Sequence, residues 1–128
     1  EVEKGGYIVF PEERESPMLL HGPLAAVNFD KDSLVQVDRD MKDAVRYHTL
    51  GHKTMGELGG VIFLSDYIEV GRKHLDQERR EKILSLTTLE EMIIYILEMQ
   101  REYFIKSGIK EAGVTSELYS FLVNGGKL

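Results

Sequence analysis

The sequence predicts an all-α fold. It has no long stretch in which apolar and polar residues alternate with period two, the pattern typical of half-buried strands. Its three prolines all fall within the first quarter of the chain, so the remainder can form long helices. Several segments instead combine apolar residues at helical spacing with capping residues. With 128 residues, 42% of them hydrophobic, the chain can build a core, and we expect residues 1–128 to form a single domain.

The first quarter predicts an irregular lead-in followed by a helix. Residues 1–17 combine Gly5-Gly6 with a short apolar run and a charged run, which indicates irregular structure with a short extended piece. Gly22-Pro23 before an apolar run predicts a helix start, because proline at the first helical position loses no needed N–H. His21 would then lie at the mouth of this helix.

A second helix is predicted to begin after Asp38, a residue type that caps helix N-termini. Its apolar side follows the spacing i, i+3, i+4, i+7, which places His48 on the inward face. Gly51 is expected to end the helix. The residues on the apolar side are Met41, Ala44, Val45 and His48.

The most apolar segment, residues 58–68, predicts a third helix that carries Asp66. A buried strand ending at Asp66 is the alternative, but the chain offers no second strand-like segment for it to pair with. We expect Asp66 to be at least partly buried. A buried carboxylate needs hydrogen bonds, a basic side chain or a metal ion, so a capping or paired aspartate is the structural interpretation.

Two further helices are predicted in the second half of the chain. Capping-box spacing occurs for Thr87 with Glu90 and for Thr88 with Glu91, and helical period then continues to Gly108. A last short helix is expected over 117–123, with its leucines and Phe121 inward.

Charge and cysteine content exclude several classes of protein. Lys and Arg number 16 against 22 Asp and Glu, so the net charge of −6 provides no broad positive field and no nucleic-acid partner is expected. The absence of cysteine excludes disulfides, Cys-based zinc sites, iron–sulfur clusters and thiol nucleophiles. No apolar run approaches the ~18 residues of a spanning helix, so no membrane partner is expected and the predicted location is cytoplasmic.

His21, His48 and Asp66 come from separate predicted helices and could converge as nitrogen and oxygen ligands for iron, manganese or zinc. Each histidine taken alone is also compatible with a structural role in the core or at a helix end. His48 and His52 have a spacing that can clamp a metal ion from one helix, but Gly51 interrupts that helix.

Arg46, Lys53 and Arg72 could contact phosphate groups. Solvated surface charge is the alternative for all three.

Three motifs in a fixed order resemble the YqeK family of HD-superfamily phosphohydrolases. They are Glu-Ser-Pro-Met-Leu-Leu-His-Gly-Pro at 15–23, Ala-Val-Arg-Tyr-His-Thr-Leu-Gly at 44–51, and Phe-Leu-Ser-Asp-Tyr-Ile-Glu-Val-Gly-Arg at 63–72. The resemblance covers residues 15–72 closely and the helical remainder more loosely.

The resemblance implies an HD-domain-like helical bundle with a dinuclear centre of divalent transition metal, either iron or manganese, with zinc as a further option. The implied activity is symmetrical hydrolysis of dinucleoside tetraphosphates, with diadenosine tetraphosphate giving two ADP. The substrate or a nucleoside diphosphate product would be the ligand, and a homodimer is an expectation at the level of the family.

Individual residues take their roles from the matching motif positions. His21, His48 and Asp66 fall on metal-ligand positions, and Asp66 is also the predicted catalytic residue. Thr49, Gly51 and Arg72 fall on phosphate-contacting positions, and Arg46 completes the predicted substrate-binding set.

The chain departs from the family at its N-terminus. The earlier ligands, a histidine and the His-Asp pair, would precede residue 15, and residues 1–14 contain no histidine. The sequence also begins at Glu1 rather than Met, so we expect it to be the C-terminal major part of a longer phosphohydrolase. Gly59-Gly60 replaces an acidic residue and a lysine, which predicts a weaker helix there.

Two other functions remain open from the sequence. One is a non-catalytic helical module that binds a nucleotide or a protein. The other is an HD-type nucleotidase of different specificity.

Overall fold

The structure is a computed structural model that describes residues 1–32, 38–69 and 75–128, without the side chains of residues 30–32. No strand occurs in these ranges, so the all-α prediction is confirmed. The helices are α1 (Pro11–Glu15), the 3-10 helix η1 (Pro17–Leu20), α2 (His21–Asp32), α3 (Arg39–Tyr47), α4 (Gly56–Ile68), α5 (Gln77–Ser85), α6 (Leu89–Ser107) and α7 (Gly113–Val123).

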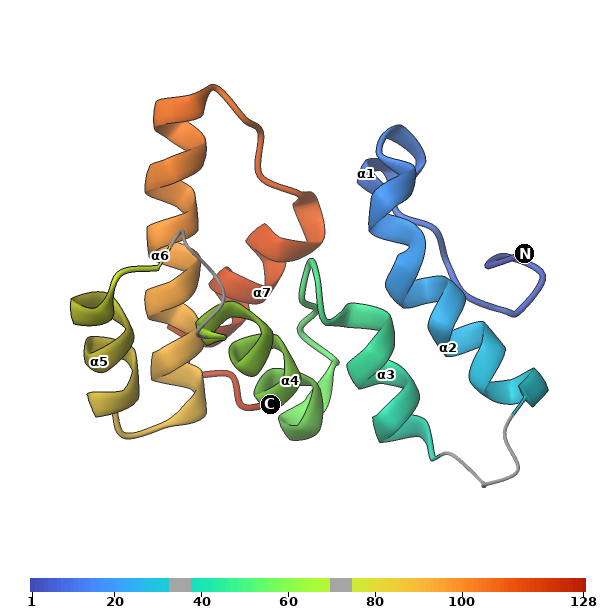
Figure 1. The fold of residues 1–128 in the computed structure, drawn as a ribbon, viewed down its shortest axis with the longest axis horizontal. Helices are drawn as coiled ribbons and strands as arrows, with labels where there is room; N and C mark the ends of the chain where they lie inside the picture. Colours follow the sequence, from blue (N-terminus) through green and yellow to red (C-terminus); the bar gives the residue numbers. More distant parts are fainter. Residues whose placement is uncertain (33–37, 70–74) are drawn as a thin grey trace.

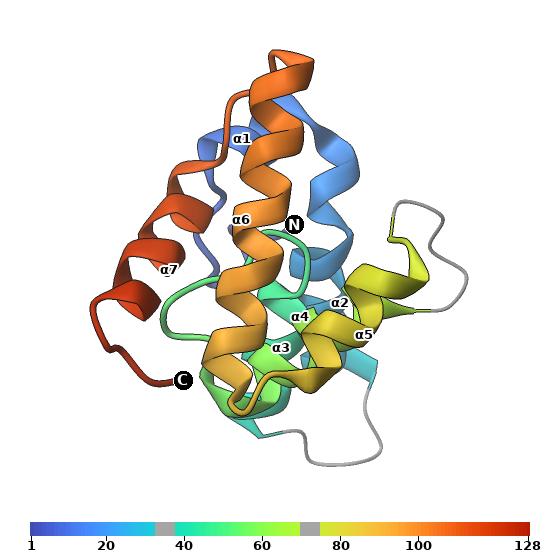
Figure 2. The ribbon, with the colours of Figure 1, turned by 90° about the vertical axis from the view of Figure 1, so that its left-hand side faces the viewer.

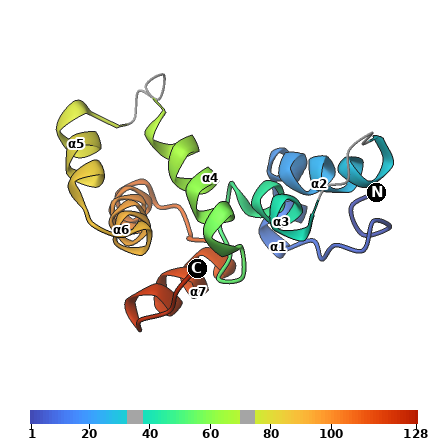
Figure 3. The same ribbon diagram turned by 90° about the horizontal axis from the view of Figure 1, so that it is seen from below.

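Helix α4 lies in the middle of the molecule. On one side it packs against α3, which in turn packs against α2 (Figure 1). On the other side it packs against α6, the longest helix, which is flanked by α5 and α7 (Figure 2). The view from below shows α4 between the two groups (Figure 3). A displacement of α4 would therefore affect both halves of the fold.

The main hydrophobic core lies among α4, α5, α6 and α7. Side chains from all four helices are buried there, and five of them are fully inaccessible. The helical prediction for residues 58–68 is confirmed by α4, whose Phe63 and Leu64 enter this core. The buried members are Met55, Phe63, Leu64, Leu75, Ile83, Ile93, Ile96, Leu97, Leu118 and Leu122.

The two adjacent glycines of α4 lie at close contacts with neighbouring helices. Gly59 is buried against Met55 and the backbone of Ala44 on α3. A Cβ atom on Gly60 would lie 2.7 Å from Leu128 and 2.9 Å from Leu89. Glycine costs helix propensity here, but it allows α4 to approach its neighbours closely.

Helices α2 and α3 also make close contact through small residues. Ala26 and Ala44 are buried, and Gly22 lies against the end of α3. A Cβ atom on Gly22 would lie 2.8 Å from the carbonyl oxygen of Val45 and 3.3 Å from the His48 ring. The separation of α2 and α3 therefore depends on the absence of a side chain at Gly22.

Local sequence signals set several helix boundaries as predicted. Asp38 accepts a hydrogen bond of 2.9 Å from the Met41 N–H at the start of α3. Of the two capping-box options, Thr88 with Glu91 forms the box, and Gly108 ends α6 with a positive φ of 69°.

Three N-terminal boundaries differ from the sequence prediction. Pro11 begins a one-turn helix where irregular structure was expected, and the Glu13 carboxylate accepts the Phe10 N–H there. Helix α2 begins at His21 rather than at Pro23, because η1 leads directly into it. Helix α7 begins at Gly113, four residues before Glu117, because the Glu12 carboxylate on α1 accepts the Gly113 N–H at 2.9 Å.

Within the ranges that the structure describes, no helix combines the length and the apolar character needed to cross a membrane.

The substitution Gly22→Ala tests the contact between α2 and α3. We expect a net loss of about 1–2 kcal/mol in the free energy of unfolding, because crowding of the Val45 carbonyl outweighs the gain in helix propensity. Urea unfolding followed by circular dichroism measures this change.

Gly113→Ala is the matched control, because the nearest atom to its new Cβ would be the Glu12 carboxylate at 3.9 Å. It should leave stability unchanged or raise it by up to ~1 kcal/mol. Equal stability of the two variants would contradict the proposed close contact.

Candidate metal site

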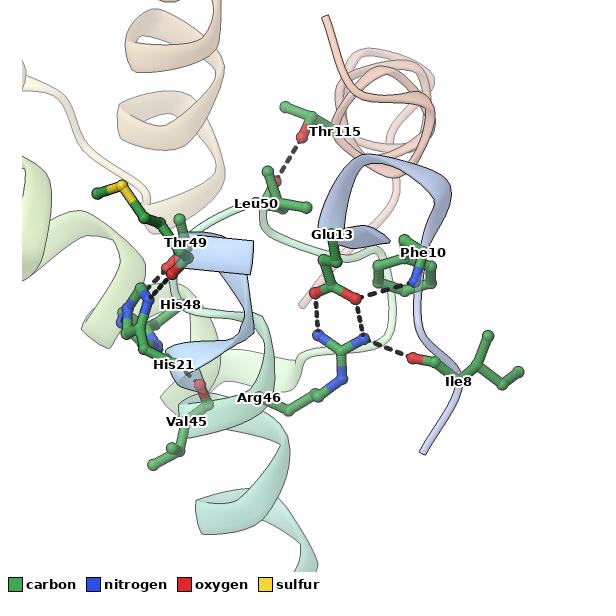
Figure 4. Close-up of polar contacts among 11 residues, drawn as sticks. Ile8, Phe10, Glu13, His21, Val45, Arg46, His48, Thr49, Leu50 and Thr115 are labelled. Carbon is green, nitrogen blue, oxygen red and sulfur yellow. Dashed lines mark hydrogen bonds and ion pairs between the residues drawn. The ribbon is translucent and has the colours of Figure 1, made fainter. Parts of the chain in front are cut away.

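Two of the predicted metal ligands, His21 and His48, meet between the start of α2 and the end of α3 (Figure 4). Their Nε2 atoms lie 2.8 Å apart, and their rings meet edge to face with centroids 4.7 Å apart. Gly22 follows His21 directly, so the close contact of the two helices brings the rings together.

Backbone carbonyls orient both rings. Nδ1 of His21 lies 2.9 Å from the Met18 carbonyl oxygen, and Nδ1 of His48 lies 2.7 Å from that of Val45. A ring nitrogen that faces a carbonyl oxygen carries the proton, so Nε2 of each neutral ring holds a lone pair. Two lone pairs at this distance repel each other, and a cation between them, either a proton or a metal ion, removes the repulsion.

Thr49 contributes a hydroxyl group beside the histidine pair. Its Oγ1 lies 3.2 Å from Nε2 of His21 and can donate a hydrogen bond to it. His21 is exposed and Thr49 is partly exposed, so the group is accessible to a ligand. The structure thus brings together three of the residues that the motifs predicted.

Asp66 does not join this group in the described part of the chain. Those residues contain no cluster of three or more His, Asp or Glu side chains placed to hold a metal ion. Asp66 is exposed, so the prediction that its carboxylate is partly buried is wrong. In α4 the buried face is formed by Phe63 and Leu64, and Asp66 follows Ile62 on the exposed face.

Arg46, one of the predicted substrate-binding residues, has a buried side chain. Its guanidinium forms a two-pronged ion pair with Glu13, with Nη1–Oε1 and Nη2–Oε2 distances of 2.7 and 3.0 Å. Only 2% of each side chain is accessible. Nη2 also donates to the Ile8 carbonyl, so this cation is already bound within the chain.

The buried ion pair is enclosed by aromatic rings. The Arg46 guanidinium lies 4.7 Å from the centroid of the Phe10 ring and 5.1 Å from that of Tyr47. Burial raises the pKa of Tyr47, and the nearby Arg46 charge opposes this rise. Arg46 lies on the last turn of α3, two residues before His48, so the pair fixes the backbone that carries this histidine.

Gly51, another of the predicted substrate-binding residues, has a structural role in the turn after α3. It is buried, its φ is 76°, and its N–H donates to the Tyr47 carbonyl. A Cβ atom there would lie 2.6 Å from Leu118. Helix α3 ends at Tyr47, earlier than the predicted end at Gly51, and the Gly51 N–H closes the turn that follows it. Arg72 lies outside the described residues.

The remaining described histidine, His52, is separate from the pair. Its ring stacks on Tyr47 with centroids 4.6 Å apart, and its Nδ1 lies 2.7 Å from the Thr54 hydroxyl. Burial lowers the pKa of His52, which favours the neutral ring. No sequence pattern indicated the role of Glu13, because this residue lies within a charged run that is typical of a solvated surface.

Comparison with solved structures identifies the fold. A predicted HD-superfamily hydrolase involved in NAD metabolism from Clostridium acetobutylicum matches with a TM-score of 0.77. The match covers 97% of this chain and 68% of that chain, at 23% sequence identity. The chain shares the fold of that protein.

Sequence comparison supports the same relationship. The chain is 33% identical over 112 residues to the symmetrical bis(5'-nucleosyl)-tetraphosphatase of Bacillus subtilis, covering 86% of this chain and 58% of that protein. A protein of the same name from Halalkalibacterium halodurans is 40% identical over 55 residues, covering 43% of this chain and 29% of the relative. No family model matches. The chain thus spans about three fifths or less of the length of these relatives, and the predicted resemblance to symmetrical tetraphosphatases is confirmed.

Glu13→Ala tests the buried ion pair. Removing one partner leaves Arg46 charged and unpaired in the interior, so we expect a loss of about 3–5 kcal/mol in the free energy of unfolding. Denaturant unfolding curves of the two proteins measure it.

The control is Arg14→Ala on the same short helix, which breaks an exposed ion pair with Glu3. It should cost less than about 1 kcal/mol. If Glu13→Ala were no less stable than Arg14→Ala, the buried pair would have no structural importance.

Proposed function

We propose that this chain forms part of a metal-dependent phosphohydrolase that cleaves dinucleoside tetraphosphates symmetrically. With diadenosine tetraphosphate, water would be added across the central phosphoanhydride and two ADP would be released. The names of the sequence relatives support the substrate class, and the histidine pair supports the metal dependence. The observation that carries the proposal is the pairing of two Nε2 atoms whose rings are fixed by backbone carbonyls.

The donor chemistry of the pair fits a divalent transition metal. Imidazole nitrogen suits iron, manganese and zinc, and metal-binding histidines usually donate their other N–H to a carbonyl or a carboxylate. His21 and His48 would hold the ion. Asp66 is proposed as a third ligand and as the catalytic carboxylate from its motif position alone, and Arg72 is proposed as a phosphate contact on the same basis.

A bound divalent cation would supply Lewis-acid chemistry at a phosphoryl group. The chain's own part is to orient the two histidine rings before any ligand arrives, through the Met18 and Val45 carbonyls. The Thr49 hydroxyl lies beside the rings and can donate a hydrogen bond to a phosphoryl oxygen. Such a cation would also offset repulsion between the polyanionic substrate and a protein of net charge −6.

The test is hydrolysis of diadenosine tetraphosphate in the presence of added manganese or iron, with the products separated by chromatography. We expect ADP as the only nucleotide product. His21→Ala and His48→Ala should each reduce metal affinity and rate by at least about 100-fold, because losing a metal ligand should cost more than losing a group that only orients one.

His52→Ala is the matched control, because His52 belongs to the ring stack with Tyr47 and not to the pair. It should keep metal affinity and rate close to those of the unmodified protein. AMP and ATP as products would contradict symmetrical cleavage. A folded chain that binds no metal and hydrolyses nothing would support the non-catalytic module instead.

A further inference from the structure

A cavity of about 420 Å³ lies between the end of α4, the start of α5 and the second half of α6. Its size falls within the range of small-molecule sites. Asp66, the proposed catalytic carboxylate, forms part of its wall. The lining residues are Asp66, Tyr67, Arg79, Met99, Gln100, Tyr103 and Phe104.

The cavity offers aromatic surface for stacking. Tyr103 is 62% exposed although it is a large apolar ring, and its centroid lies 6.1 Å from that of the neighbouring Phe104. Tyr67 is half-buried on the α4 side. Exposed aromatic rings beside a cavity are the usual platform for a planar base.

Polar groups accompany the rings. The Gln100 side chain makes no hydrogen bond with any residue that the structure describes, so its amide can both donate and accept. Burial raises the pKa of Tyr67 against the lowering effect of Arg79, so its hydroxyl keeps its proton at neutral pH. The Arg79 guanidinium, about half exposed, adds a cation.

We propose that this cavity binds the nucleoside end, base and ribose, of a nucleotide whose phosphates extend toward Asp66. The base would stack on Tyr103, and the Gln100 amide would hydrogen-bond its edge. This inference rests on the proposed function, because that function supplies the phosphate site on the Asp66 side.

The combination of aromatic rings and polar side chains in the cavity favours a nucleoside over a purely apolar ligand or a bare phosphate. An apolar ligand would leave the Gln100 amide without a partner. A bare phosphate would gain Arg79 but would make no use of the rings at Tyr103 and Phe104. A nucleoside uses both kinds of group.

Isothermal titration of the manganese-loaded chain with ADP and with pyrophosphate tests the proposal, since the two share phosphates and differ in the nucleoside. Tyr103→Ala should weaken ADP binding by at least about fivefold through the loss of stacking and leave pyrophosphate binding unchanged. Gln100→Ala should act in the same direction. Tyr103→Phe should keep ADP affinity because the ring remains.

Ile105→Ala is the matched control, since Ile105 is 81% exposed on the same helix and does not line the cavity. The proposal would be overturned if Tyr103→Ala and Gln100→Ala bound ADP as tightly as Ile105→Ala does. Equal weakening of ADP and pyrophosphate would also overturn it, because the nucleoside would then not be the group recognised.

The two proposals fail in different ways. The chain could bind ADP in a way that depends on Tyr103 and yet hydrolyse no dinucleoside tetraphosphate. That result would overturn the proposed function and support the cavity as a nucleotide site. Hydrolysis that depends on His21 and His48 but is indifferent to Tyr103 would overturn the cavity proposal alone. Absence of binding by either ligand would count against both.

Discussion

The close approach of α2 to the end of α3 determines the geometry of the candidate metal site. Gly22 allows the backbone of α2 to lie against the carbonyl of Val45, the same carbonyl that orients the His48 ring. His21 precedes this glycine and meets His48 across the contact at 2.8 Å. Packing and chemistry are therefore coupled, because a change in the spacing of the two helices changes the distance between the ligands.

A second constraint holds the end of α3 from the other side. The buried pair of Glu13 and Arg46 links the N-terminal segment to the turn of helix that precedes His48. The two-pronged geometry and the aromatic rings around it define one orientation of the guanidinium. This cation therefore holds the end of α3 in place.

The sequence predicted features that depend on local chemistry. The Asp38 and Thr88 caps and the helix over residues 58–68 follow from short-range patterns. The sequence also predicted that His21, His48 and Asp66 converge, and of these three described residues the structure brings the two histidines together. The burial of Arg46 depends on a partner 33 residues away, and the start of α7 depends on a carboxylate 101 residues away from Gly113. No local pattern contains these distant partners.

The wrong prediction that Asp66 is partly buried has a different origin. It depends on which face of α4 is packed, and the apolar residues of this helix do not mark that face. Gly59 and Gly60 mark the packed face together with Phe63 and Leu64, whereas Leu58, Val61 and Ile62 share the exposed face with Asp66. Apolar residues occupy both faces, so hydrophobicity alone could not distinguish them. The glycines carried the missing signal, since a close helix contact requires small residues.

The most direct test of the account is the nitrogen NMR spectrum of the histidine rings during titration of the full chain with zinc, a diamagnetic ion. Both His21 and His48 should begin as Nδ1–H tautomers, and their Nε2 signals should shift together while the His52 ring is unaffected. The metal site would be contradicted if the Nε2 signals of His21 and His48 did not respond to zinc. It would also be contradicted if the two rings carried their proton on Nε2 and not on Nδ1.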